Sequence, residues 1–230
     1  MQGTYDCQIW VKICGIADIE TAQAAVRCGA SAIGFVFAEK SPRRVSPETA
    51  RRISNSLPRG IEKVGVFVDE DPGKVAQIAG FCGLDLVQLH GRESPEYCRA
   101  LGLPVIKAFR VRDARGARDL DVEDPAEIME RYAAVTNVAR FLLDTYVAGN
   151  PGGTGRSFDW AVAASLVARA RRPVILAGGL TPENVARAIS IARPFGVDVS
   201  SGVESNGRKD AGLIRLFLEN ANSGEGELPI

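Results

Sequence analysis

The most constraining feature of this sequence is an alternation of short apolar runs with amphipathic helical patterns, repeated eight times. The runs are three to five residues long, rich in β-branched side chains and largely uninterrupted by polar residues. Continuous apolar runs of this kind are typical of parallel strands that are covered on both faces. They lie at residues 9–13, 32–36, 64–68, 86–89, 105–109, 141–143, 174–177 and 197–199.

The segments between the runs carry helical signals. Val75, Ile78, Ala79 and Cys82, for example, recur at the i, i+3, i+4, i+7 spacing of one helix face. Helix starts are marked by a capping residue followed by proline, because the cap satisfies an orphan N–H and proline lacks one. We predict such starts at Ser46-Pro47, Asp71-Pro72, Ser94-Pro95, Asp124-Pro125 and Thr181-Pro182, and glycine helix ends at Gly29, Gly83 and Gly102.

Eight consecutive strand–helix units within about 220 residues predict a (β/α)₈ TIM barrel, an α/β fold with its active site at the C-terminal ends of the strands. No linker or shift of composition divides the series, so we expect a single domain over residues 1–230, with 1–8 and 223–230 peripheral or frayed. The alternative is an open, doubly wound sheet. Its dinucleotide fingerprint is missing, because Cys14-Gly15-Ile16 after the first run is not G-x-G-x-x-G.

Composition excludes several classes of protein. The 28 basic and 28 acidic residues balance, so nothing favours binding to nucleic acid. No apolar run approaches the roughly 20 residues of a membrane span, and the start lacks a signal-peptide pattern, which predicts a cytoplasmic protein. Five cysteines without C-x-x-C spacing and a single histidine predict reduced thiols and no metal site. A monomer and a homodimer are both compatible with the sequence.

The loops that would follow strands 7 and 8 are small and unobstructed. They contain Gly178-Gly179 and Ser200-Ser201-Gly202. Backbone N–H groups in such loops can approach an oxyanion, and TIM barrels commonly hold a phosphate at this place. One Gly-Gly alone would favour a simple tight turn, but two adjacent loops of this kind favour a phosphate site. The sequence therefore predicts a small phosphorylated substrate.

Two further strand ends carry candidate catalytic groups. Cys14 ends the first run before Gly15, where a thiolate could act as a base or nucleophile if its pKa is lowered; the alternative is an inert buried thiol. Asp144 ends a wholly apolar run, where a carboxyl group holds its proton more tightly and can donate it; the alternative is a loop cap. Gln88 and His90 end the fourth run as candidate substrate-binding residues, although His90 could equally be a packing residue.

Together these segments resemble phosphoribosylanthranilate isomerase. The similarity runs in order from about Val11 to Asn222, and its most specific parts are Lys12-Ile13-Cys14-Gly15 and the run from Asp198 to Glu204. Other matching segments are 34–37, 41–43, 65–68, 87–91, 142–145, 153–155, 158–160 and 178–184. The resemblance implies a cofactor-independent enzyme of tryptophan biosynthesis on a single (β/α)₈ barrel.

The implied reaction is an Amadori rearrangement of N-(5'-phosphoribosyl)anthranilate to the 1-deoxyribulose 5-phosphate. By resemblance, Cys14 is the general base and Asp144 the general acid, and Arg43 pairs with the anthranilate carboxylate. The loops around Gly178-Gly179 and Ser200-Ser201-Gly202 would hold the phosphate. Departures from the family pattern are Ala177 in place of a common serine and Arg44. The charged stretch 110–135 is expected to be a solvated excursion, and the glycine-rich loop 151–155 a mobile cover.

Other readings are less favoured by the residues. A metal-dependent sugar-phosphate epimerase would need several histidines, and the chain has one. The indole-forming synthase of the same pathway uses a lysine at a strand end, whereas Lys12 and Lys107 lie inside strands. A sister isomerase acting on an aminoimidazole carboxamide ribonucleotide usually has aspartate where Cys14 stands. A non-catalytic sugar-phosphate sensor would require neither Cys14 nor Asp144.

Overall fold

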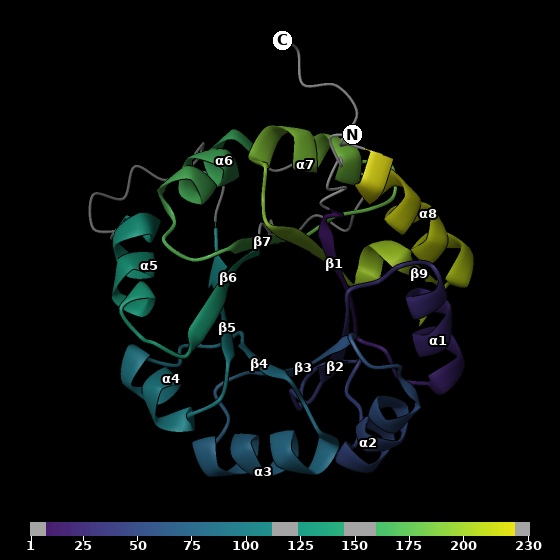
Figure 1. Cartoon of the computed structure of the whole chain (residues 1–230), viewed down its shortest axis with the longest axis horizontal. Coiled ribbons are helices and arrows are strands. Elements are labelled where there is room, and N and C mark those ends of the chain that lie inside the picture. The colour runs from purple at the N-terminus through teal and green to yellow at the C-terminus, as the bar shows by residue number, and fades with distance from the viewer. Residues whose placement is uncertain (1–7, 112–123, 145–159, 224–230) are drawn as a thin grey trace, which may run out of the picture.

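A computed structural model of the chain describes residues 8–111, 124–144 and 160–223. Eight parallel strands, paired in sequence order, close into a barrel inside a ring of helices (Figure 1). The strands are β1 (Trp10–Cys14), β2 (Ala32–Val36), β3 (Glu62–Phe67), β4 (Leu86–Leu89), β5 (Val105–Arg110), β6 (Val138–Asp144), β7 (Val174–Ala177) and β8 (Gly196–Val199).

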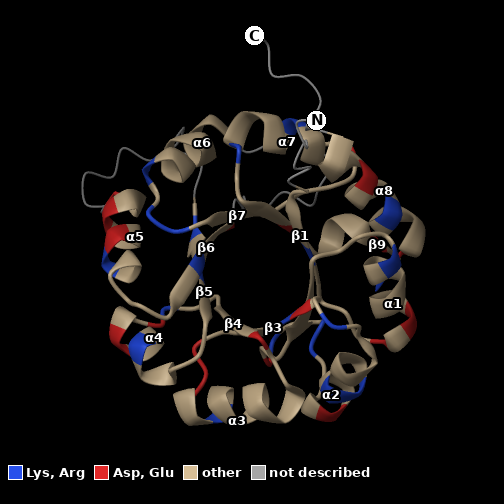
Figure 2. Ribbon diagram, viewed as in Figure 1, with Lys and Arg blue, Asp and Glu red and all other residues tan. Residues whose placement is uncertain are grey.

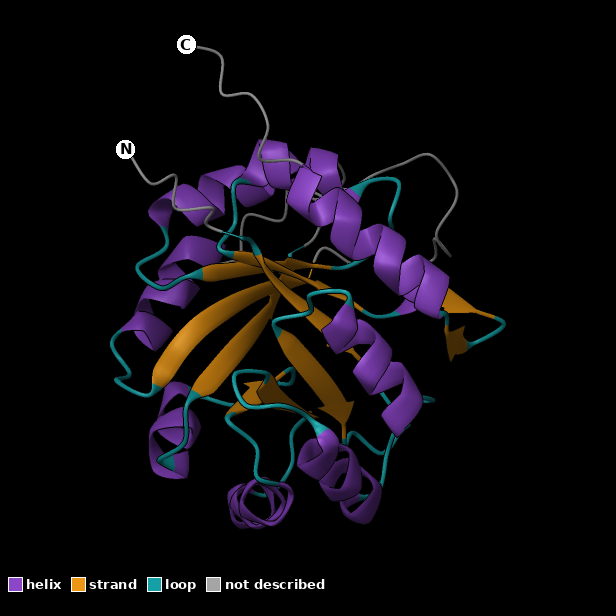
Figure 3. Cartoon of the chain, turned by 45° about the vertical axis from the view of Figure 1, so that its right-hand side comes forward, coloured by secondary structure: helices purple, strands orange, loops and turns teal. Residues whose placement is uncertain are grey.

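The helices between the strands cover the outside of the barrel, as the turned view of Figure 3 shows. They are α1 (Ile19–Arg27), α2 (Pro47–Ser56), α3 (Pro72–Cys82), α4 (Pro95–Leu101), α5 (Pro125–Ala133), α6 (Trp160–Arg169), α7 (Val185–Ala192) and α8 (Ala211–Ser223). A short 3₁₀ helix, η1 (Ser201–Val203), and a two-stranded hairpin of β9 (Glu204–Ser205) and β10 (Arg208–Lys209) lie between β8 and α8. The predicted (β/α)₈ barrel is therefore confirmed.

The predicted strand positions are also confirmed, and several strands extend beyond the apolar runs. β6 begins at Val138, three residues before its run, and β5 continues to Arg110. The extension of β6 adds Val138, Ala139 and Arg140, and that of β5 adds the exposed Arg110. Of the residues expected to be peripheral, Gln8 and Ser223 are described and are exposed; 1–7 and 224–230 lie outside the described residues.

Four of the five predicted helix starts are confirmed. The side chains of Ser46, Asp71, Ser94 and Asp124 each accept a backbone N–H in the first turn, and proline follows each of them. The start at Thr181-Pro182 is wrong, because α7 begins only at Val185. Asn184 instead ties the preceding turn, accepting from Thr181 N at 2.8 Å and donating to Gly179 O at 3.0 Å. This turn keeps the loop after β7 compact.

The charged stretch 110–135 is only partly an excursion. Residues 112–123 are outside the described residues, but Pro125–Ala133 forms α5 and packs Ala126, Met129 and Tyr132 into the core. The expectation of a wholly solvated segment is wrong for this part. Its charges lie on the outward face of an amphipathic helix, whose inward face is apolar.

Side chains of alternate residues fill the inside of the barrel. On β1 these are Trp10, Lys12 and Cys14, while Val11 and Ile13 pack outward against the helices. An apolar cluster that includes Trp10, Val64 and Leu142 fills much of the interior, and Arg140 and Glu62 form an ion pair at 2.6 Å beside it. Lys12 lies two residues before Cys14 on the same face of β1, inside the barrel.

Charges of both signs are interspersed over the outer helices in the view of Figure 2, with no sector of a single sign. In the part of the chain that the structure describes, no helix is both long and apolar enough to cross a bilayer. The chain's zero formal charge thus corresponds to a mixed surface.

Candidate active site

Cys14 occupies the end of β1, at the C-terminal opening of the barrel, and is 7% exposed. Its neighbour on β2 is Gly34, where a Cβ atom would lie 2.9 Å from Cys14 Sγ. Glycine at this position is therefore what leaves room for the thiol. Gly15 then turns the chain away with φ of 80°, a left-handed conformation that suits glycine. The thiol is held in a tight, defined place.

A buried cation lies beside this thiol. Lys12 is fully buried and its Nζ is 3.0 Å from Asp198 Oδ2 and 2.7 Å from Gln88 Oε1. Burial raises the pKa of the Cys14 thiol, and the charge of Lys12 opposes that rise without cancelling it. Burial lowers the pKa of Lys12, but Asp198 and Cys14 outweigh this and leave it raised. The pKa of the Cys14 thiol is thus raised, whereas a thiolate base would need a lowered one. Among the groups around the thiol, Lys12 has the largest lowering effect on this pKa.

Asp144 ends β6, which is separated from β1 by β7 and β8 around the closed barrel. Its Oδ2 lies 3.1 Å from His90 Nε2, and His90 Nδ1 lies 3.2 Å from Gln88 Nε2. The Asp144 and His90 side chains are about one-fifth exposed, at 19% and 20%. Gln88 is buried below them. The structure therefore brings three of the predicted site residues into one connected group.

Arg43, in the loop after β2, forms a second polar group with two residues beyond β8. Its Nε and Nη2 each donate to a Glu204 carboxylate oxygen at 2.6 Å, and Lys209 Nζ donates to Glu204 Oε1 at 2.7 Å. The hydrogen bonds from Arg43, helped by Lys209, lower the pKa of Glu204 to about 2. Glu204 is thus ionised at neutral pH and fixes the guanidinium, which keeps further N–H donors for a ligand.

The predicted phosphate loops lie next to one another after β7 and β8. Gly178 and Gly179 have φ of 88° and 63°, and a Cβ at Gly179 would meet nothing within 4 Å. A Cβ at Gly202 would collide with the Leu180 carbonyl, so the two loops are in direct contact there. Lys209 Nζ also donates to Ser200 O at 2.9 Å. Lys209 thus ties the second loop to the hairpin of β9 and β10, where it also pairs with Glu204.

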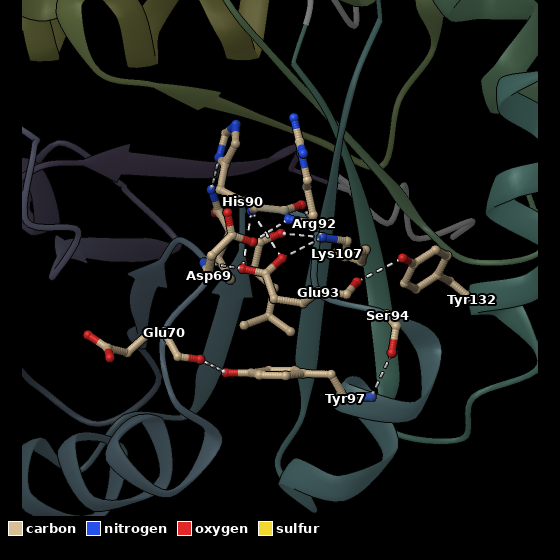
Figure 4. A network of polar contacts seen from close by, with 12 residues as sticks. Asp69, Glu70, His90, Arg92, Glu93, Ser94, Tyr97, Lys107 and Tyr132 are labelled. Carbon is tan, nitrogen blue, oxygen red and sulfur yellow. Dashed lines mark hydrogen bonds and ion pairs between the residues drawn. The ribbon is translucent and has the colours of Figure 1, made fainter. Parts of the chain in front are cut away.

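A third polar network, shown in Figure 4, fixes the loop that follows His90. Glu93 accepts from Asp69 N at 2.9 Å and from Gly91 N at 3.0 Å. Lys107, from β5, donates to Glu93 Oε2 at 2.7 Å and to Gly91 O at 2.8 Å. Tyr132, on α5, donates to the Glu93 carbonyl at 2.8 Å. The loop after His90 is therefore held by hydrogen bonds to three other segments: Asp69 after β3, Lys107 in β5 and Tyr132 in α5.

Sequence reasoning did not anticipate several residues of these groups. The sequence patterns place Lys12 and Lys107 inside strands and predict no individual role for Glu93, Asp198, Glu204 or Lys209. A signal was present for Lys12, Lys107 and Asp198, because a charged residue inside an apolar strand requires a buried partner. Nothing local indicated Glu93, Glu204 or Lys209. The loop 151–155 lies outside the described residues, and among the described ones no three His, Cys, Asp or Glu are placed to hold a metal.

Comparison with known proteins identifies the family. The family model described as N-(5'phosphoribosyl)anthranilate (PRA) isomerase matches residues 11–220. This chain belongs to the PRA isomerase family. A curated relative, the N-(5'-phosphoribosyl)anthranilate isomerase of Desulforudis audaxviator (strain MP104C), is 54% identical over 92% of this chain and 97% of its own.

Solved PRA isomerases have the same fold. The crystal structure of phosphoribosyl anthranilate isomerase from Thermotoga maritima is 44% identical, with a TM-score of 0.80 over 94% of this chain and 99% of that one. A second crystal structure, 43% identical with a TM-score of 0.77 and the same coverage, is a PRA isomerase in complex with reduced 1-(o-carboxyphenylamino)-1-deoxyribulose 5-phosphate. The resemblance to the PRA isomerase family that the sequence suggested is confirmed.

Proposed function

We infer that this protein is an N-(5'-phosphoribosyl)anthranilate isomerase of tryptophan biosynthesis. It rearranges the aldose-amine to 1-(2-carboxyphenylamino)-1-deoxyribulose 5-phosphate. The observation that carries this inference is the family match over residues 11–220, combined with Cys14 and Asp144 at two strand ends of the same barrel opening.

The reaction needs one acid and one base on different sides of the sugar. Proton donation to the ribose ring oxygen breaks the C1'–O bond and opens the ring to an iminium ion. Removal of the C2' proton then gives an enaminol, which becomes the ketose when its hydroxyl proton is lost and C1' is protonated. Asp144 is the proposed acid and Cys14 the proposed base. No net oxidation occurs, so the sequence of proton transfers is complete without a cofactor.

The substrate is small and anionic at both ends, and the site offers a distinct partner for each end. Arg43 is proposed to bind the anthranilate carboxylate, because Glu204 already fixes its guanidinium and three of its N–H donors lie outside that bidentate pair. The loops at Gly178-Gly179 and Ser200–Gly202 are proposed to bind the phosphate through backbone N–H groups. These partners would orient the sugar between Cys14 and Asp144.

The first test follows the fluorescence of phosphoribosylanthranilate with the purified protein. The wild type should consume it, and absence of consumption would reject the inferred activity. Cys14→Ala and Asp144→Ala should each lower kcat by at least ~10²-fold, the usual loss for an acid–base group. Cys28→Ala, at the C-terminal end of α1, is the matched control and should keep full activity. Full activity in Cys14→Ala or Asp144→Ala would overturn the assigned roles.

A further inference from the structure

A continuous series of side-chain contacts runs across the barrel from β1 to β6. Lys12 Nζ donates to Gln88 Oε1 at 2.7 Å. Gln88 Nε2 meets His90 Nδ1 at 3.2 Å, and His90 Nε2 meets Asp144 Oδ2 at 3.1 Å. The first member is fully buried and the last is at the barrel opening. One series of hydrogen bonds thus leads from the interior cation to the proposed catalytic acid.

The chemistry of Lys12 sets the direction of every hydrogen bond in this series. An ammonium group has three donors and no acceptor, so the Gln88 atom facing it must be the carbonyl oxygen. The other end of that amide is then an NH₂ group, which can only donate. His90 Nδ1 must accept from it, and a neutral imidazole whose Nδ1 accepts carries its hydrogen on Nε2.

We propose that Lys12 and Gln88 hold His90 in its Nε2–H tautomer, so that His90 donates a hydrogen bond to Asp144 Oδ2 and reserves Oδ1 for proton transfer to the substrate. Lys12 and Gln88 are then positioning residues that act through His90. The link to catalysis rests on the proposed function, whereas the tautomer itself is a property of the free protein.

Further contacts hold Lys12 and His90 in the positions that this hydrogen-bond order requires. Asp198 is the register partner of Lys12 on the neighbouring strand β8, and its ion pair at 3.0 Å anchors the ammonium. The backbone N–H of His90 donates to Phe67 O at 2.9 Å, at the end of β3. The next residue, Gly91, is clamped by Glu93 and Lys107. The imidazole therefore sits on a fixed backbone, and its tautomer is selected by its neighbours.

The arrangement has a chemical consequence for Asp144. With Oδ2 accepting from His90, the proton of the neutral carboxyl group resides on Oδ1. After that proton is transferred, the new carboxylate still accepts the His90 hydrogen bond, which stabilises its charge. An Nδ1–H tautomer would place the Nε2 lone pair against the carboxylate and remove this stabilisation. The His90 tautomer therefore matters most after Asp144 has given up its proton and carries a negative charge.

The tautomer can be measured directly, because His90 is the only histidine of the chain. Two-bond ¹H–¹⁵N correlation spectra of protein labelled with ¹⁵N-histidine need no assignment to separate side chains. We expect a protonated-type Nε2 and an acceptor-type Nδ1 in the free wild type at neutral pH. A purification tag must contain no histidine. An Nδ1–H pattern in the wild type would overturn the proposal.

The Nε2–H tautomer also predominates in free neutral histidine, so the wild-type spectrum alone is not decisive. The decisive comparison is a variant that reverses the hydrogen bond between residue 88 and His90 Nδ1. In Gln88→Glu one carboxylate oxygen can accept from Lys12 while the other accepts from His90, which requires a hydrogen on Nδ1. The Nδ1 resonance should therefore change to the protonated type. Gln77→Glu adds the same charge on the exposed face of α3 and should leave the His90 spectrum and kcat unchanged. An acceptor-type Nδ1 in Gln88→Glu would refute the proposal.

Kinetics then separates positioning from binding. Both Gln88→Glu and the shape-conserving Gln88→Met should lower kcat roughly 10- to 100-fold, the scale of losses when an orienting residue is removed, with KM changed by less than about threefold. A rise in KM with unchanged kcat would assign Gln88 to substrate binding and overturn the positioning role. If the wild type showed the Nε2–H pattern and Gln88→Glu reversed it, but neither consumed the substrate, only the proposed function would fail.

Discussion

The barrel contains two buried lysines that look alike in the sequence and differ in the structure. Lys12 lies in β1 and Lys107 in β5, and each forms an ion pair with a buried carboxylate. Lys12 points into the barrel interior with Cys14, two residues further on. Lys107 points outward, since its neighbours Ile106 and Ala108 are the interior residues of β5. The two pairs therefore lie on opposite faces of the same sheet.

The outward pair is completed mainly by backbone groups. Glu93 accepts from the N–H groups of Asp69 and Gly91, and Lys107 donates to the Gly91 carbonyl as well as to Glu93. Both carboxylate oxygens of Glu93 have hydrogen-bond donors. A pair of this type fixes the shape of a loop, because moving the loop would leave buried charges and backbone groups unsatisfied.

The inward pair is completed by side chains. Lys12 contacts Asp198, Gln88 and Cys14, and through Gln88 it reaches His90. Asp198 Oδ1 is buried and has no hydrogen-bond partner in the structure. The two ion pairs thus differ in their surroundings: backbone groups of one loop surround Lys107 and Glu93, whereas Lys12 and Asp198 are joined to side chains that lead to His90.

The largest expected effect concerns the outward pair. Glu93→Gln keeps the shape of the side chain but replaces an acceptor oxygen by an NH₂ group, which must face either backbone N–H donors or the Lys107 ammonium. We expect the free energy of unfolding to fall by about 3–5 kcal/mol, as when one partner of a buried ion pair is removed. Urea denaturation followed by circular dichroism measures this. A loss below about 1 kcal/mol would show that the loop does not depend on the pair.

The next effect concerns the inward cation and the Cys14 thiol. Lys12→Met removes the positive charge that opposes the burial effect, so the pKa of Cys14 should rise further. Because the thiolate is the reactive form, alkylation of Cys14 by iodoacetamide at a fixed pH should slow at least about tenfold, equivalent to one pKa unit. Mass spectrometry of the Cys14 peptide across a pH series measures it. Near-ultraviolet circular dichroism is the control that the variant is folded. A pH profile of alkylation identical to that of the wild type would contradict the effect of Lys12 on the pKa of Cys14.

The smallest effect is expected at Asp198. Asp198→Asn keeps an oxygen that can accept from Lys12 but removes the countercharge of a fully buried ammonium, so the free energy of unfolding should fall by about 1–3 kcal/mol. The loss should be smaller than for Glu93→Gln, because Gln88 Oε1 still accepts from Lys12 at 2.7 Å and no backbone N–H bonded to Asp198 is left without an acceptor. The negative charge of Asp198 raises the pKa of Cys14, so its removal should lower that pKa and speed alkylation. The same two measurements apply. A loss as large as that of Glu93→Gln would abolish the distinction between the pairs.

Much of the fold could be predicted from the sequence because its signals are local. Apolar runs, capping residues and glycine helix ends act within a few residues, so the eight strands and four capped helix starts are confirmed. The start at Thr181-Pro182 failed because Asn184 satisfies the local backbone groups in a turn instead of a helix. Cys14 and Asp144 were predicted from their places at strand ends, and their catalytic roles stay predictions.

The partners of these residues could not be predicted in the same way. Glu204 lies 161 positions after Arg43, and Gln88 lies 76 positions after Lys12 on a non-adjacent strand. Burial also raises the pKa of Cys14, whereas the sequence-based hypothesis of a thiolate base required a lowered one. A strand-end cysteine indicates a position, but its electrostatics depend on every group packed around it.

Local signals in the sequence are enough to place eight strand–helix units, and the alternation of side chains along a strand with a period of two puts Lys12 on the same face as Cys14. Which groups that face contacts depends on the folded barrel. Barrel closure pairs β1 with β8 and sets Lys12 beside Asp198, and it brings Gln88 of β4 across the interior to the same ammonium. These contacts depend on the stagger of strands around a closed barrel, which no local stretch of sequence contains.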